Sequence, residues 1–131
     1  MKLVFWMFMV FFSCQVATGQ DNQIVMNTAI FEMNAVDQQP EFPNGPDAFY
    51  YFFNKNFRLP EIPTLIGKIF LSFVVEIDGT LSDIKTIKDI GFGTGTEAEN
   101  VLHKSPKWIP GKKDEKLVRV LYLLPIPIQT H

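Results

Sequence analysis

Residues 67–90, Gly-Lys-Ile-Phe-Leu-Ser-Phe-Val-Val-Glu-Ile-Asp-Gly-Thr-Leu-Ser-Asp-Ile-Lys-Thr-Ile-Lys-Asp-Ile, decide the fold because they predict one β-hairpin. Alternate positions of the first half are apolar and line one face of a strand: Ile69, Leu71, Phe73 and Val75. Asp78-Gly79 supplies a turn, since both residue types tolerate a positive φ. The return from Leu81 to Ile90 is less regular in period, which predicts a β-bulge.

A short helix is predicted before the hairpin, over Asp47–Asn56. Pro46 suits the first helical position, where a missing N–H costs nothing. Three phenylalanines follow at the spacing of one helix face: Phe49, Phe52 and Phe53. This aromatic stripe indicates a helix face buried in the core rather than a cofactor site.

A second helix is predicted after the hairpin, over Thr96–Lys104. The preceding Gly91–Glu97 holds three glycines, so a phosphate-binding loop and a structural loop both need weighing. The stretch lacks the G-x-G-x-x-G spacing and no Gly-Lys-Ser/Thr follows. Thr94 and Glu97 instead match the S/T-x-x-E capping box of a helix start, which favours the structural interpretation.

The last strand is predicted over Leu117–Leu124, and Pro125 and Pro127 are expected to end it. Because proline cannot donate to a sheet ladder, this end of the strand must lie on an edge or past the pairing region. Trp108, in the charged loop before the strand, is expected to be a packing anchor rather than a binding contact.

Residues 1–19 predict a secretory signal peptide: Lys2, an apolar run and then Ala17-Thr18-Gly19. Two alternatives stay open, lipidation at Cys14 in a sequence that loosely resembles a lipobox, and an uncleaved N-terminal anchor. Residues 20–39 are expected to form a partly ordered arm that could add a short edge strand, and residues 40–131 one domain. Each N-terminal alternative places the chain outside the cytoplasm, in the periplasm or tethered to a membrane.

The composition excludes several classes of protein. The chain has 131 residues and a formal net charge of −2, without the basic stripe that a nucleic-acid surface needs. His103 and His131 are the only histidines, and no Ser/His/Asp, paired-carboxylate or metal-ligand spacing is visible. We therefore expect no enzyme activity and no cofactor.

An ordered set of short motifs resembles the C-terminal domain of TonB, in the form common in Bacteroidetes-type bacteria. The resemblance covers about residues 40–128. It is carried by Phe42-Pro43, Lys55–Pro60, Gly67–Ile69, Phe73–Glu76, Asp78–Leu81, Ser105–Gly111, Val118–Val120 and Leu124–Ile126. Two departures stand out: Asp114-Glu115-Lys116 stands where the family usually has a glycine, and Leu59 where it often has tyrosine.

The resemblance implies an α+β fold in the order α-β-β-α-β, with two helices on one face of a three-stranded antiparallel sheet and room for a short extra N-terminal strand. In that family the domain captures the extended TonB box of an outer-membrane receptor beside its final strand, for energy-coupled transmembrane transport. The physical mode is β-augmentation, in which a partner strand pairs with an exposed sheet edge.

Carried onto this chain, the partner-binding edge is the last strand, expected to be bare over Val118, Arg119, Val120, Leu121, Tyr122, Leu123 and Leu124. Arg119 could pair with an acidic group beside a receptor box, or act as a charged gatekeeper against aggregation. The expected partners are a TonB-dependent receptor or another periplasmic protein. The alternative is a self-associating structural or accessory domain, a homodimer through the last strand.

This chain is not expected to transmit force by itself. Full-length TonB-type transducers have a Pro-rich spacer, whereas residues 20–39 hold no Pro/Lys-rich run. About 20 residues at ~3.5 Å each reach at most ~70 Å. The sequence therefore predicts a binding module rather than a complete transducer.

Overall fold

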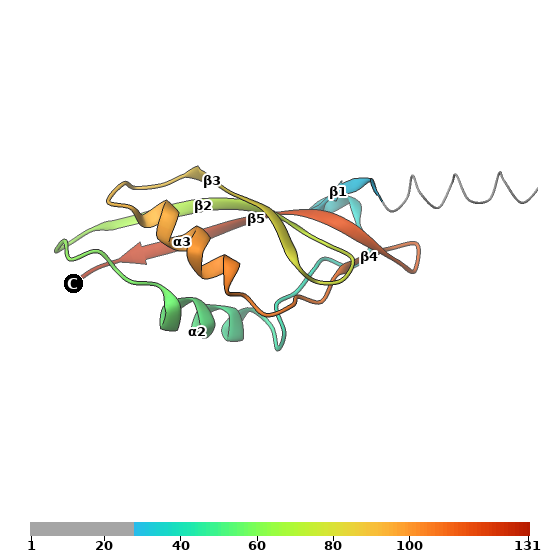
Figure 1. The fold of residues 1–131 in the computed structure, drawn as a ribbon, viewed down its shortest axis with the longest axis horizontal. Coiled ribbons are helices and arrows are strands. Elements are labelled where there is room, and N and C mark those ends of the chain that lie inside the picture. The colour runs from blue at the N-terminus through green and yellow to red at the C-terminus, as the bar shows by residue number, and fades with distance from the viewer. Residues whose placement is uncertain (1–27) are drawn as a thin grey trace, which may run out of the picture.

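The computed structural model describes residues 28–131, so the signal peptide, Cys14 and the first part of the arm lie outside the described residues. Figure 1 shows the helices lying against one twisted sheet. The elements are β1 (Ile30–Glu32), the 3₁₀ turn η1 (Met33–Ala35), α2 (Pro46–Asn56), β2 (Ile66–Val75), β3 (Leu81–Lys88), α3 (Thr94–His103), β4 (Gly111–Lys113) and β5 (Lys116–Gln129).

The sheet is mixed and five-stranded, in the order β1-β5-β2-β3, with β4 also paired to β5. The α+β class with two helices is confirmed, but the sheet is not the expected three-stranded antiparallel one. The arm supplies β1, which runs parallel to β5 with Ile30 opposite Arg119. β4 folds back on β5 as a tight hairpin, with Gly111 opposite Val118.

The central hairpin forms as its sequence predicts. Ile69, Leu71, Phe73 and Val75 are completely buried in β2. Gly79 makes the turn at φ +88°, and its carbonyl accepts a hydrogen bond from the Trp108 N–H at 2.8 Å. The register of β2 and β3 shifts twice, which confirms the irregular return strand.

One core lies between α2, α3 and a single face of the sheet. Phe49 and Phe53 of α2 are buried, as are Ala98, Val101 and Leu102 of α3. Trp108 is 5% exposed and packs among four aromatic rings, so its expected packing role is confirmed. From Tyr122 to Ile128 the even-numbered side chains of β5 enter this core, while Leu123 and the odd-numbered residues after it are exposed.

Two local predictions are wrong. Helix α3 begins at Thr94 rather than Thr96, and no side chain caps it. The Thr94 hydroxyl donates to the Gly91 carbonyl at 2.7 Å, and Glu97 Oε1 accepts the Arg58 N–H at 3.2 Å. The capping box therefore does not form, because Thr94 bonds to the loop before α3 and Glu97 to the segment that follows α2.

The last strand does not end at Pro125. β5 continues to Gln129, with Pro125 opposite Phe70 and Pro127 opposite Lys68. A proline is tolerated inside a ladder when its nitrogen faces away from the neighbouring strand. The two prolines of β5 meet this condition, as described below.

Candidate functional site

The outer edge of β5, the edge turned away from β2, is where the resemblance places strand binding. Val118 pairs with β4, and Arg119 to Leu121 pair with β1. The expectation of a bare edge is therefore wrong for Arg119–Leu121, because the chain's own arm occupies it, and for Val118, whose backbone pairs with β4 on the side of β5 that also faces β2. From Tyr122 to Gln129 no strand of the described residues pairs with this edge.

The odd-numbered residues of β5 direct their backbone groups to the outer edge. The N–H of Leu123 points to Met33 Sδ in η1, at 3.4 Å, and in a strand the N–H and C=O of every second residue point the same way. Arg119 and Leu121 therefore face β1. Pro125 and Pro127 face the same side but have no N–H, so β5 loses no hydrogen bond to β2 at either proline.

The donors of the outer edge are thus confined to a short stretch. Leu117, Arg119, Leu121 and Leu123 each present an N–H, and beyond them the next outward donor is Gln129. A visiting strand can form a complete ladder only over Leu117–Leu123, because backbone pairing needs both donors and acceptors. There it has to replace β1.

The arm that occupies this stretch is lightly held. β1 has three residues, and its Ile30 side chain is 49% exposed. The half-buried Phe31 lies under the ammonium of Lys113, which is 5.6 Å from the ring centroid. Lys113 also donates to the Ala35 carbonyl at 3.0 Å. These are surface contacts of modest strength.

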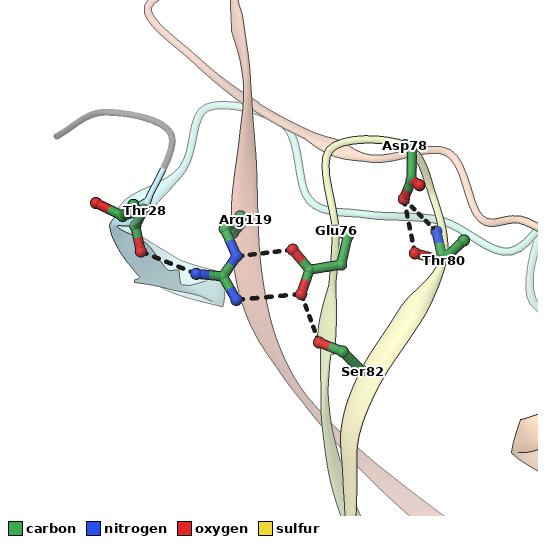
Figure 2. A network of polar contacts seen from close by, with 6 residues as sticks. All are labelled: Thr28, Glu76, Asp78, Thr80, Ser82 and Arg119. Carbon is green, nitrogen blue, oxygen red and sulfur yellow. Dashed lines mark hydrogen bonds and ion pairs between the residues drawn. The ribbon is translucent and has the colours of Figure 1, made fainter. Parts of the chain in front are cut away.

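Arg119 fastens the arm to the end of the hairpin, as Figure 2 shows. Its Nε and Nη2 donate to Glu76 Oε1 and Oε2, at 2.7 and 3.1 Å, and its Nη1 donates to the Thr28 carbonyl at 2.9 Å. Hydrogen bonds from Arg119 and Ser82 hold the pKa of Glu76 below its ordinary value of 4.5, against the opposing effect of burial. The sequence analysis missed Glu76 as the partner of Arg119, since the two residues lie far apart along the chain.

The opposite edge of the sheet, on β3, is protected against strand addition. Its register against β2 is broken twice, and Asp83 at one irregularity has φ +50°. Asp83, Lys85 and Lys88 are all exposed along it. Bulges and charges of this kind discourage edge-to-edge pairing, so the β5 edge is the better candidate of the two.

A hollow of about 210 Å³ adjoins the outer edge of β5 on the helix side of the sheet. Tyr122 and Leu124 of β5 form one wall, and the start of α2 and the segment before it form the others. The Tyr122 ring stacks on Phe73 at 5.3 Å and meets Trp108 edge-on at 5.2 Å. Burial raises the pKa of Tyr122, and the nearby Tyr50 and Glu41 raise it further.

Comparison of the chain with protein-family models, with curated proteins and with solved structures gives no match. Within residues 28–131, no helix is long and apolar enough to cross a bilayer. In the same residues no three His, Cys, Asp or Glu side chains gather as metal ligands would. His103 is exposed at the end of α3.

Proposed function

We propose that this chain is a periplasmic strand-binding module of the TonB C-terminal type. It captures an extended segment of a TonB-dependent outer-membrane receptor along the outer edge of β5. Within the element order, α2, β2, β3, α3 and β5 follow the α-β-β-α-β arrangement that the resemblance implies, with β1 and β4 as additions. The observation that carries the proposal is the edge itself: a run of outward donors that includes Arg119, Leu121 and Leu123, guarded by a three-residue arm.

Binding proceeds by exchange of strands. The receptor segment takes the place of β1 opposite Arg119 and Leu121 and also reaches Leu123, which β1 does not pair with. Each net backbone hydrogen bond contributes about 1 kcal/mol, so a longer visiting strand gains over the arm. When the arm leaves, Arg119 Nη1 loses the Thr28 carbonyl and becomes available to an acidic or carbonyl group of the receptor.

A peptide that copies a TonB box tests this proposal by NMR titration. We expect the amide signals of Arg119–Leu123 to shift, together with those of Ile30–Glu32 as β1 is released. Phe31→Pro removes the N–H at the centre of β1 and should tighten peptide binding about fivefold, since it removes roughly 1 kcal/mol of competition. Phe31→Leu keeps the N–H and should bind the peptide with the affinity of the parent. Equal peptide affinity for the parent and both variants would contradict the exchange of strands.

Self-association is the second candidate function, and β1 is the observation that favours it. A short arm that pairs with β5 of its own chain can pair with β5 of a second copy in the same register. This alternative expects a dimer that grows with concentration and is lost in Phe31→Pro. Sedimentation of both proteins separates it from the receptor module, which expects a monomer until peptide is added.

A further inference from the structure

We infer that the hollow beside Tyr122 is a side-chain pocket that receives the lysine or arginine of the visiting strand. The inference deepens the proposed function, because it adds a specificity site to the backbone pairing. In β-augmentation, main-chain hydrogen bonds supply affinity while pockets for alternate side chains supply choice. A residue that pairs opposite the Tyr122 region of β5 directs its side chain to this face of the sheet.

Aromatic rings form a large part of the walls of the hollow. Five rings and one carboxylate contribute to them: Glu41, Phe42, Phe49, Tyr50, Trp108 and Tyr122. The rings are fixed by one another, with Phe42 and Phe49 at 5.7 and 5.8 Å from Trp108. The Trp108 indole N–H donates to Ser105 Oγ at 2.9 Å, so its only polar atom is already satisfied. The lining is therefore preorganised and offers ring surface.

Tyr50 and Tyr122 are the rings of the lining that a ligand reaches most easily. Tyr50 is 39% exposed and Tyr122 is half-buried, whereas Phe42, Phe49 and Trp108 are almost fully covered. A cation above the face of a tyrosine is attracted by the ring quadrupole. The aliphatic stem of lysine or arginine packs meanwhile on the buried rings beneath.

The charge of the hollow selects a cation. Glu41 is the one acidic side chain of the lining, and no Lys, Arg or His of residues 28–131 lines it. Glu41 is held in place by its backbone, which exchanges hydrogen bonds with Ile109 at 3.0 and 2.7 Å. Its carboxylate is exposed and takes part in no ion pair within residues 28–131. The raised pKa of Tyr122 has Glu41 among its causes and agrees with a negative local potential.

A pair of small probes tests the pocket without the edge. Nα-acetyl-lysine N-methylamide and Nα-acetyl-norleucine N-methylamide have the same stem, and only the first carries an ammonium. We expect the lysine probe to shift the ring signals of Tyr50 and Tyr122. The norleucine probe should bind at least about fivefold more weakly. Equal shifts from both probes would overturn the cation assignment, and no shift from either would overturn the pocket.

Variants separate charge from ring surface. Glu41→Gln should weaken the binding of the lysine probe about fivefold. Tyr50→Leu should weaken the binding of both probes. Glu61 is an exposed acid outside the lining, so Glu61→Gln should leave the binding of the lysine probe unchanged. A loss of affinity as large as that in Glu41→Gln would also overturn the assignment of a cation pocket. The backbone amides of Arg119–Leu123 report strand capture separately, so a failed pocket and a failed receptor module give different spectra.

Discussion

Arg119 shows how one side chain serves both the fold and the candidate site. Its guanidinium joins β5 to Glu76 at the end of the hairpin and to the Thr28 carbonyl at the start of the arm. The two side chains are only 26% and 21% exposed. A paired Arg–carboxylate fork with this shielding is stronger than an ordinary surface ion pair.

Glu76→Gln should destabilise the fold by about 1 kcal/mol at pH 7. Because the folded-state pKa of Glu76 lies below 4.5, the stabilisation is present above that pH and fades as the pH falls through the folded value. The free energies of unfolding of the parent and of Glu76→Gln, measured in urea, should therefore converge as the pH falls through the folded-state pKa. Asp83→Asn, which removes the exposed pair with Lys85, should change the free energy of unfolding little at any pH. If the destabilisation by Glu76→Gln were the same at every pH, the role given to the Arg119–Glu76 pair would be refuted.

The β4–β5 turn stores strain at the position where the resemblance leads one to expect glycine. Asp114 and Glu115 have φ of +50° and +65°, the left-handed conformation that glycine adopts without penalty. Glu115→Gly should stabilise the protein by about 1 kcal/mol, measured as the free energy of unfolding in urea. Glu115→Ala removes the same charge but keeps the strain, so it should give no gain. A loss of stability in Glu115→Gly would contradict this account of the turn.

At the scale of the element, Pro125 and Pro127 act as blocks on the outer edge of β5. They keep every bond to β2 and remove the two donors that a foreign strand would need beyond Leu123. The bare half of the edge is thereby closed to strand addition, and the usable stretch is the half that β1 guards.

Replacing both prolines by valine should reopen the edge. Pro125→Val with Pro127→Val restores two outward N–H groups, so we expect the folded protein to associate at concentrations where the parent does not, by sedimentation. Pro125→Lys with Pro127→Lys restores the same two N–H donors but adds charges that discourage strand pairing. This variant should therefore associate less than the valine variant. A valine variant no more associated than the parent would mean that the prolines are not what protects this edge.

The elements that could be predicted from the sequence are those with a local signal. The period of two in β2, the Pro46 start of α2 and the Asp78-Gly79 turn each depend on neighbouring residues, and all three are in the structure. The capping box was wrong because Thr94 and Glu97 found loop partners, which no motif reveals. The end of β5 was wrong because the direction of a proline nitrogen depends on which edge is paired.

The sequence predicts which strand carries the candidate site, but not what lies beside that strand. That β5 carries the edge follows from the order of elements, but its occupation by β1 depends on a parallel pairing between residues about 90 positions apart. The hollow beside Tyr122 likewise gathers Glu41, Tyr50 and Trp108 from separate segments. Neither feature leaves a periodic or spaced pattern in the chain.

At the scale of the whole molecule, the protein is a two-layer body of helices and sheet with one short strand, β1, at its rim. The core and the β2–β5 ladder are fully formed, whereas β1 adds three exposed or half-buried residues at the rim. Elements with few buried contacts open first, so the arm can leave without unfolding the domain. In the proposed function, that departure opens the outer edge of β5 to the visiting strand.

Amide hydrogen exchange with and without a TonB-box peptide tests this central claim most directly. The Leu123 N–H reaches only the thioether of Met33, a weak acceptor, so it should exchange rapidly in the free protein. With peptide bound it should slow at least about tenfold as it gains a backbone carbonyl, while Phe31 exchanges faster because β1 is displaced. Bound peptide that leaves Leu123 and Phe31 unchanged, or that protects the amides of β3 instead, would contradict the account.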